Sequence, residues 1–397
     1  MIKCLSATLL PLTLVGISLF VTTSSKDPMP DSQADTSTEQ SVSPLRDSFK
    51  GKFRIGAAVS TALLRGQEAG AEKILRKHFD SVTAENAMKP DAIQPREGEF
   101  TFADADKLVE IAKESGAEVV GHTLIWHSQT PRWFFEGKDG QPITRELALQ
   151  RLRTHIKTVV SRYKGRIREW DVVNEAINDG PGVLRQTPWL RAIGEDYIAE
   201  AFRAAHEADP EAILVYNDYN IELDYKRPKA VELLKKLIDQ KVPVHAVGIQ
   251  SHWRVQSPPL AETEKAIKEF SALGLKVMIT EFDMGVLPTQ YQGADLSRAQ
   301  SLTPEQLAVL NPYTQGLPAE AAQLHADKVK ESIDLFLRYQ KNIGRVTFWG
   351  IHDGHSWLNN FPIRGRTDYP LLFDRELKPK PAFFAVQKAA QAARSSE

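Results

Sequence analysis

The chain has 397 residues, of which 42% are hydrophobic, so it can bury a large core and does not belong to the intrinsically disordered class. Lys and Arg (50) nearly balance Asp and Glu (51). This balance gives no overall field that would favour nucleic acid, acidic membranes or polyanions, and we therefore expect a neutral ligand.

The first 25 residues have the features of a secretory signal peptide. Lys3 precedes an apolar run over 9–20, and small residues follow at 22–25. The run is short for a membrane span, although an uncleaved membrane anchor is the alternative. The only cysteine, Cys4, precedes the run, so we expect neither a lipid-anchored cysteine nor a thiol in the mature chain. These features predict a secreted protein, located in the periplasm, at the cell surface or outside the cell.

Residues 26–46 are polar and rich in Ser, Thr, Asp and Gln. Such a segment cannot bury enough apolar surface to order itself, so it is predicted to be a disordered linker. The folded domain is predicted over 47–392.

Within this domain, eight short β-rich apolar runs alternate with segments whose apolar residues recur three and four positions apart. The runs are 53–59, 80–83, 118–126, 167–173, 213–216, 244–250, 276–281 and 345–349, and the helical segments include 105–114, 147–163, 230–240, 260–273 and 319–340. This alternation predicts βαβ units of the α/β class, and eight units suit a (β/α)8 TIM barrel, a single catalytic domain with enlarged βα loops. The alternative is a doubly wound open sheet, but no Gly-x-Gly-x-x-Gly follows the first run.

Polar residues follow nearly every run, and two of them are the carboxylates Glu175 and Glu281. The strands of a barrel end at one face, so we expect these residues to converge on one cleft. Glycoside hydrolysis needs such a pair, one carboxyl to protonate the leaving oxygen and the other to attack the anomeric carbon or to activate water.

The other side chains at the strand ends suit a sugar ligand. Sugar rings present apolar faces that pack on indoles, and their hydroxyls bond to amide, imidazole and ammonium groups. The candidates are Trp126, Trp349 and Trp357 for packing, and Asn86, Lys89, His122, Gln129, Asn174 and Gln250 for hydrogen bonds.

His252 has two carboxylates on the following strand with which it can interact. It stands two residues after Gln250, and Asp283 stands two residues after Glu281, so these side chains share faces on their strands. The spacing predicts a chain in which Asp283 orients His252 and His252 orients Glu281, where it would tune a nucleophile.

No metal site is predicted. An odd spacing puts His122 and His127 on opposite faces of a strand, and no carboxylate or cysteine completes a tetrahedral ligand set with them or with the pair His352 and His355. The long, turn-rich connection over 285–317 either walls one end of the cleft or is a surface insertion.

Seven segments, taken together and in order, resemble the glycoside hydrolase family 10 endo-β-1,4-xylanases. They are TAENAMKP at 83–90, GHTLIWHSQ at 121–129, WDVVNEA at 170–176, YNDYN at 216–220, GIQSH at 248–252, ITEFD at 279–283 and TFWG at 347–350. The resemblance implies a (β/α)8 barrel and a retaining double displacement, with Glu175 as general acid/base and Glu281 as the nucleophile that forms a covalent glycosyl-enzyme. Retention would place the two carboxyl groups about 5 to 5.5 Å apart.

The resemblance also implies positions for the sugars. The sugar at the cleavage point would be surrounded by Asn174, His122, Gln250 and Trp349. Sugars on its non-reducing side would meet Glu85, Asn86, Lys89, Trp126, Gln129 and Trp357, and those on the leaving-group side Tyr219 and Asn220. A cis peptide between His122 and Thr123 is implied as well. Phe282 stands where the family usually has Leu, which would alter packing rather than chemistry.

The implied protein is a monomeric, cofactor-free endo-1,4-β-xylanase that acts on xylan or xylo-oligosaccharides, without a nucleic-acid or protein partner. One alternative is a β-1,4-glucanase or a mixed-specificity hydrolase of the same family, since the sequence does not show whether the site admits a hydroxymethyl group. The other is a non-catalytic polysaccharide-binding barrel, which the presence of both Glu175 and Glu281 disfavours.

Overall fold

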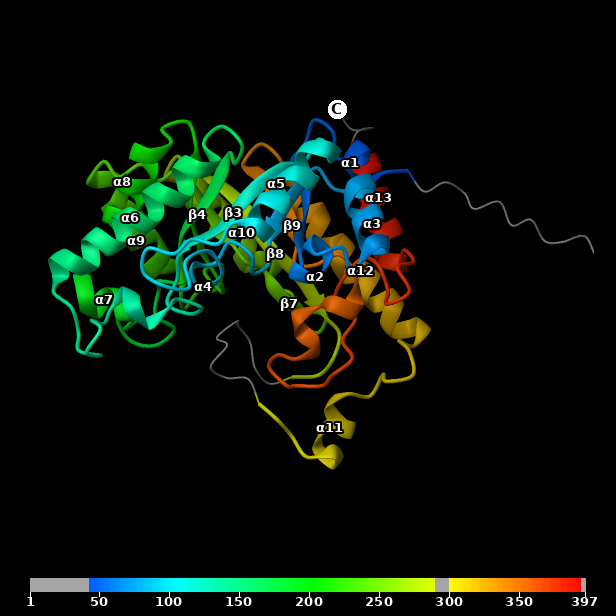
Figure 1. Cartoon of the computed structure of the whole chain (residues 1–397). Helices are drawn as coiled ribbons and strands as arrows, with labels where there is room; N and C mark the ends of the chain where they lie inside the picture. Colours follow the sequence, from blue (N-terminus) through cyan, green and yellow to red (C-terminus); the bar gives the residue numbers. More distant parts are fainter. Residues whose placement is uncertain (1–42, 290–299, 394–397) are drawn as a thin grey trace, which may run out of the picture. The chain divides into compact units, whose positions relative to one another are not determined.

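The computed structural model describes residues 43–289 and 300–393 (Figure 1). The predicted signal peptide at 1–25, and the predicted linker up to residue 42, lie outside the described residues. Helix α1 (Leu45–Ser48) begins just before the predicted domain boundary at 47. Leu45 is fully buried and its backbone N–H donates to Nδ1 of His78, so the folded unit already includes these residues.

Eight parallel strands close into a barrel in the order β6, β5, β4, β3, β2, β1, β9, β8, and β8 pairs in turn with β6. Their bounds are β1 (Arg54–Val59), β2 (Ser81–Ala84), β3 (Glu118–Ile125), β4 (Glu169–Asn174), β5 (Ile213–Asp218), β6 (Ala246–Ile249), β8 (Lys276–Gly285) and β9 (Ile343–Phe348). Each predicted run overlaps one of these strands, so the barrel prediction is confirmed and the open-sheet alternative is wrong. The runs are continuously apolar because a barrel strand is covered by side chains inside and by helices outside.

A ninth strand, β7 (His252–Arg254), extends the barrel wall at one end. Ser251, with φ of +63°, turns the chain between β6 and β7. β7 pairs in parallel with the last part of β8, which places His252 opposite Asp283. The pairing therefore fixes the register of two side chains that the sequence analysis linked.

Helices surround the strands, as Figure 1 shows. They are α2 (Thr61–Leu64), α3 (Ala69–His78), α4 (Pro90–Ile93), α5 (Ala103–Ser115), α6 (Arg145–Tyr163), α7 (Pro188–Ile193), α8 (Tyr197–Ala208), α9 (Arg227–Asp239), α10 (Leu260–Ala272), α11 (Pro304–Leu310), α12 (Ala319–Arg338) and α13 (Pro381–Ala392), with the 3-10 helices η1 (Arg132–Phe134), η3 (Asp353–His355) and η4 (Trp357–Asn359). α6 shows why a helix could be predicted over 147–163. Its N-cap Thr144 accepts from the N–H of Leu147, and Leu152, Ile156 and Val159 follow at helical spacing on its buried face.

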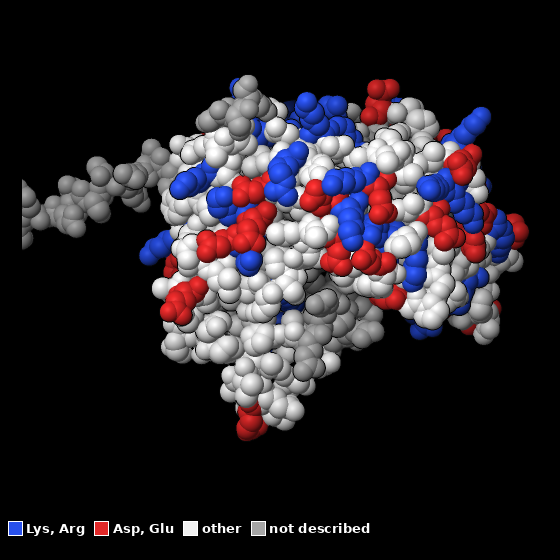
Figure 2. Space-filling view, turned by 180° about the vertical axis from the view of Figure 1, so that it is seen from behind, with Lys and Arg blue, Asp and Glu red and all other residues white. Residues whose placement is uncertain are grey.

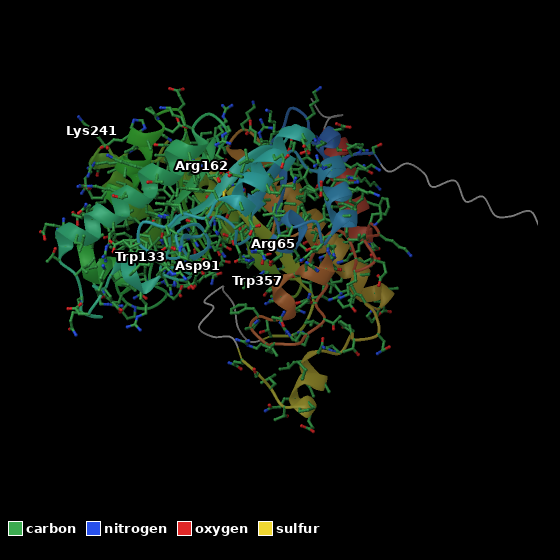
Figure 3. The ribbon with its side chains drawn as sticks, in the orientation of Figure 1. Arg65, Asp91, Trp133, Arg162, Lys241 and Trp357 are labelled. Carbon is green, nitrogen blue, oxygen red and sulfur yellow. The ribbon has the colours of Figure 1, made fainter. Side chains whose placement is uncertain are left out.

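The two ends of the barrel differ. At the end where the strands begin, Arg345 is buried and its Nη2 lies 2.5 Å from Oε1 of Glu169. Because the strands are parallel, Lys241, which precedes β6, and Trp357, which follows β9, belong to opposite ends of the barrel; both are labelled in Figure 3. The end that carries Trp357 is the one where barrel enzymes place their chemistry.

Basic and acidic side chains are intermingled on the face drawn in Figure 2. This distribution agrees with the balanced charge of the sequence. In the part of the chain that the structure describes, no helix is both long and apolar enough to cross a membrane.

The predicted long connection over 285–317 is described on both sides of residues 290–299, which lie outside the described residues. Its described parts contact the segment 360–369: Nη1 of Arg366 donates to the carbonyl of Pro288 at 3.0 Å, and the hydroxyl of Tyr369 donates to the carbonyl of Tyr313. α11 begins with a capping box between Thr303 and Gln306.

Candidate active site

A polar cleft lies at the end of the barrel where the strands finish. Its lining consists of Glu85, Asn86, Lys89, His122, Trp126, Gln129, Asn174, Glu175, Gln250, His252, Glu281, Trp349 and Trp357. All of these are predicted site residues. Of the remaining three, Asp283 lies behind His252, Asn220 lines an adjoining groove, and Tyr219 is buried beside the cleft.

Glu175 directly follows β4 and is only 4% exposed. Nε1 of Trp126 donates to its Oε2 at 2.8 Å, and Nε2 of Gln250 donates to its Oε1 at 3.0 Å. Burial, and then the negative charge of Asp218, raise the pKa of Glu175 to about 7, against the effect of both hydrogen bonds. This carboxyl group therefore carries a proton at mildly acidic pH and can release it near neutrality, which suits a general acid/base.

The backbone at Glu175 is left-handed, with φ of +57°. A non-glycine residue in this region costs on the order of 1 to 3 kcal/mol unless its surroundings hold it. Here the N–H of Glu175 donates to the carbonyl of Asn217 at 2.9 Å, and the N–H groups of Ala176 and Ile177 both donate to the hydroxyl of Tyr216 at 3.1 Å. β5 thus fixes the turn that points Glu175 into the cleft.

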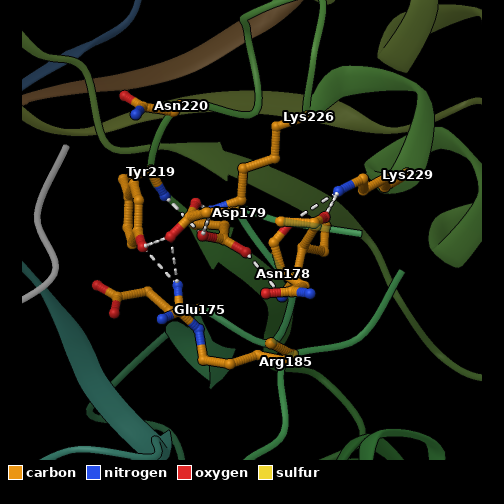
Figure 4. Close-up of polar contacts among 12 residues, drawn as sticks. Glu175, Asn178, Asp179, Arg185, Tyr219, Asn220, Lys226 and Lys229 are labelled. Carbon is orange, nitrogen blue, oxygen red and sulfur yellow. Dashed lines mark hydrogen bonds and ion pairs between the residues drawn. The ribbon is translucent and has the colours of Figure 1, made fainter. Parts of the chain in front are cut away.

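A buried charge network lies behind this turn. Asp218 accepts from the hydroxyl of Tyr216 at 2.6 Å and from the N–H of Ile177 at 3.2 Å. Lys226 is fully buried and donates to both Asp218 and Asp179 at 3.0 Å. Figure 4 labels Lys226 and Asp179. Burial alone would lower the pKa of Lys226, but the two carboxylates raise it, so the network keeps a positive charge beside two negative ones.

Tyr219 belongs to this network rather than to the wall of the cleft. Figure 4 draws its hydroxyl in contact with Asp179 and Arg185, and Nζ of Lys226 lies 3.6 Å from its ring centroid. Tyr219 is 2% exposed, so its hydroxyl is already used inside the protein. The sequence analysis missed Asp179, Arg185 and Lys226, because their ionic contacts join residues far apart in the chain.

Glu281 lies within β8 and is 5% exposed. Nδ2 of Asn217 donates to its Oε1 at 2.7 Å, and Nε2 of His252 lies 3.2 Å from its Oε2. Burial alone would raise the pKa of Glu281, but the His252 bond, the nearby charge of His122 and the Asn217 bond together lower it. Glu281 is therefore an anion at the pH where Glu175 still holds a proton.

The predicted chain of side chains behind Glu281 is present in the structure. Nδ1 of His252 lies 3.0 Å from Oδ2 of Asp283, and Nε1 of Trp357 donates to the same oxygen at 2.7 Å. His252 is buried, which would lower its pKa, but the charge of Asp283 and the bonds to Asp283 and Glu281 raise it well above its usual value. A cationic His252 between the two carboxylates neutralises charge directly behind Glu281.

The side of the cleft towards β2 and β3 is built around Lys89. Its Nζ donates to Oδ1 of Asn86 at 3.1 Å and to Oε1 of Gln129 at 2.9 Å, and it lies 4.8 Å from the ring centroid of Trp126. Burial lowers the pKa of Lys89, and burial raises the pKa of Glu85. These groups give a neutral, hydroxyl-rich ligand several hydrogen-bonding partners.

His122 completes the wall next to Glu281. Its Nδ1 lies 2.8 Å from Oδ2 of Asp171, and its ring meets that of Trp349 edge-on with centroids 5.3 Å apart. The peptide between His122 and Thr123 is cis, as the resemblance implied. The sequence analysis missed Asp171, the partner of His122, and Asn217, the partner of Glu281. Asp171 lies inside its predicted run, and the contact of Asn217 with Glu281 joins residues 64 positions apart in the chain.

Two further positions that the sequence analysis named are Asn220 and Phe282. Asn220 lines a groove of about 450 Å³ that also touches His252 and Trp357, and its Nδ2 donates to the hydroxyl of Tyr225 at 3.0 Å. Phe282 is buried and packs on Trp253 with ring centroids 5.5 Å apart.

Comparisons with known proteins agree with this geometry. The model of glycosyl hydrolase family 10 matches residues 44–389. An endo-1,4-beta-xylanase B from Paenibacillus barcinonensis is 43% identical over 346 residues, which are 87% of this chain and 98% of that one. Among solved structures, a GH10 endoxylanase retrieved from a sugarcane soil metagenome has a TM-score of 0.82 at 40% identity, over 88% of this chain and all of that chain. A mutant structure in complex with xylotriose has a TM-score of 0.78 at 38% identity, over 87% and 99% of the two chains.

Proposed function

The chain belongs to glycosyl hydrolase family 10, and we propose that it is an endo-1,4-β-xylanase that cleaves internal β-1,4 bonds of xylan with retention of configuration. The observation that carries the proposal is the difference between two carboxyl groups in one cleft. Glu175 has a pKa raised to about 7, whereas that of Glu281 is lowered. Two carboxyl groups whose pKa values differ in this way supply one acid and one anion at the same pH.

In the first step, a carboxylate oxygen of Glu281 attacks the anomeric carbon. The bond from that carbon to the glycosidic oxygen breaks, and the oxygen takes the proton of Glu175. The leaving part of the chain departs with a new hydroxyl group, and the remaining part stays as an ester on Glu281.

In the second step, Glu175 is a base. It takes a proton from water, and the water oxygen attacks the anomeric carbon and displaces Glu281 as a carboxylate. The pKa of Glu175 near 7 allows both proton transfers. The charge of His252 stabilises Glu281 as an anion, and so assists its departure in this step.

Sugar recognition follows from the walls of the cleft. Trp349 and Trp357 offer indole surfaces, and Lys89 and Gln129 offer donors and acceptors at its far side. The xylotriose complex of a family relative supports a xylo-oligosaccharide as the ligand of this cleft. Asn220 and the adjoining groove would contact the leaving-group side.

Export and oligomeric state are part of the same proposal. We propose that residues 1–25 direct secretion, because their apolar run and the small residues behind it have the pattern of a signal peptide, and that the enzyme acts as a monomer on a polymer outside the cytoplasm. N-terminal sequencing of the exported protein and its mass in solution test the two statements.

The test of the activity is the release of reducing ends from xylan. Wild type should release them, and Glu281→Gln, which keeps the shape of the side chain but not its charge, should lose activity by several orders of magnitude. Glu118→Gln, at the opposite end of the barrel, is the matched control and should remain active. If wild type releases no more than Glu281→Gln, the barrel only binds polysaccharide.

A parallel assay on a soluble β-1,4-glucan decides between xylan specificity and mixed specificity.

A further inference from the structure

A cluster of three metal-ligating side chains lies apart from the catalytic pair. Glu68 is the residue before α3, and His352 and His355 flank η3 after β9. Their ligand atoms all lie within 4.8 Å of one another, and this is the only such group in the parts of the chain that the structure describes. The sequence analysis found no carboxylate for this histidine pair, because Glu68 is 284 residues away from His352 along the chain.

The carboxylate of Glu68 stands between the two imidazoles. Nδ1 of His355 lies 2.7 Å from Oε1, and Nε2 of His352 lies 3.4 Å from Oε2. The hydroxyl of Ser60 donates to Oε1 at 2.6 Å and helps to orient the carboxylate. Two imidazole nitrogens and a carboxylate therefore lie close enough together to share one ion after a small movement.

Glu68 has no lysine or arginine partner among the described residues. Its side chain is 11% exposed, and its ion-pair contacts there are with the two histidines alone. The charge of Arg375 reaches His352. Carboxylates shielded from water are usually paired with a cation or bound to a metal, so Glu68 is a suitable ligand for a cation.

The donor set is suited to zinc. Zn²⁺ binds imidazole nitrogen and carboxylate oxygen at about 2.0 to 2.2 Å, and two His and one Glu occur together in zinc sites that keep an open fourth position. In a tetrahedral site, ligands at that distance lie about 3.4 Å apart. The side chain of His355 is 44% exposed, so it can move towards the other two ligands and leaves access for the ion and for water.

We propose that Glu68, His352 and His355 bind a divalent transition metal of the Zn²⁺ class. The ion would replace the imidazole contacts with Glu68 by three coordinate bonds and keep an open position towards solvent. Among the described residues, Nδ1 of His352 has no hydrogen-bond partner and is buried, so the site lacks the outer acceptor that strengthens zinc ligands. We expect it to bind about 10 to 100 times more weakly than a site with that acceptor.

The site is independent of the hydrolysis but adjoins the cleft. Trp357, which lines the cleft, follows His355 by two residues. A bound ion would tie the residue before α3 to the segment that carries Trp357. We therefore expect Zn²⁺ to raise the melting temperature of the enzyme.

The test is calorimetric titration of the full, metal-free chain with Zn²⁺, together with melting in the presence and absence of the ion. Wild type should bind one ion and melt at higher temperature with it, and His355→Gln and Glu68→Gln should each weaken binding at least tenfold and lose the shift. His206→Gln removes a half-buried imidazole from another pair of rings, which lie 6.5 Å apart, and should bind as wild type does.

Melting without zinc shows whether each variant is folded, and His355 is exposed enough for its replacement to be tolerated. The proposal is overturned if wild type shows no stoichiometric binding, or if His355→Gln and Glu68→Gln bind Zn²⁺ as tightly as wild type. Loss of xylan hydrolysis would not bear on this result, because the readouts are binding and melting.

Discussion

Replacing Asp218 by Asn should move the alkaline limb of the pH profile of kcat/KM to lower pH. Asp218 is not in the cleft, but its negative charge is the largest contribution after burial to the raised pKa of Glu175. Asn keeps the size of the side chain and an oxygen that can accept from Ile177 and Tyr216. The change removes the charge, and also the acceptor that Oδ1 offers to Lys226 and to the N–H of Tyr219.

The magnitude follows from electrostatics. At an effective dielectric constant of about 20, Coulomb's law gives about 4 kcal/mol for two unit charges about 4 Å apart, and the energy halves when the separation doubles. A shift of one pKa unit corresponds to about 1.4 kcal/mol. Lys226, 3.0 Å from Asp218, cancels part of this field. We therefore expect the pKa of Glu175 to fall by about one unit.

The sign is fixed by the role of Glu175. It must be protonated for the first step, so activity falls as the pH rises through its pKa, and a lower pKa brings that fall to lower pH. At pH 8 the variant should have about one tenth of the wild-type kcat/KM, and at pH 5 the two should be similar.

The assay is hydrolysis of an aryl xylobioside over the whole pH range, because the midpoint of a limb does not depend on the amount of active enzyme. Asp179→Asn is the matched control, since Asp179 also pairs with Lys226 at 3.0 Å but is not among the main charges that act on Glu175. An alkaline limb that stays in place in Asp218→Asn, or that moves equally in Asp179→Asn, would refute the reasoning.

Three further changes test other contacts. Trp126→Phe removes the donor to Glu175, so the alkaline limb should move up by roughly one unit, because a hydrogen bond to a charged group contributes about 1.5 to 3 kcal/mol; a downward shift would contradict the assigned bond. His252→Gln removes the cation that lowers the pKa of Glu281, so the acid limb should move to higher pH, and an unmoved limb would remove His252 from this role. Arg345→Met leaves its buried carboxylate partner unpaired and should cost about 3 to 5 kcal/mol of unfolding free energy in denaturant titration, and a loss below 1 kcal/mol would show that the pair is solvated.

Much of the fold could be predicted because its pattern is repeated along the chain. Each barrel strand is a continuous apolar run, and the helices between them have apolar residues at helical spacing. The pattern of each segment therefore indicates its element, and the alternation of the segments indicates the barrel. The carboxylates Glu175 and Glu281 were found for a related reason: a barrel brings every strand end to one face.

Other features depend on contacts that no local pattern records. The short β7 strand has only three residues, yet it sets His252 opposite Asp283. In the sequence Lys226 is a charged residue just before a helix, which is usually exposed, and only the fold shows it buried between Asp218 and Asp179. Tyr219 follows a strand as a sugar-binding tyrosine would, but its hydroxyl is taken by groups inside the protein.

The central claim is that Glu281 forms a covalent bond with the sugar, and one measurement tests it directly. In a xylobioside with fluorine at C2, both formation and hydrolysis of the ester are slowed. A good leaving group speeds formation alone, so the ester should accumulate. Mass spectrometry of the digested protein should then find one added xylobiosyl group, on the peptide that contains Glu281. An adduct on Glu175 instead, or no adduct while the unsubstituted glycoside is hydrolysed with inversion, would contradict the mechanism.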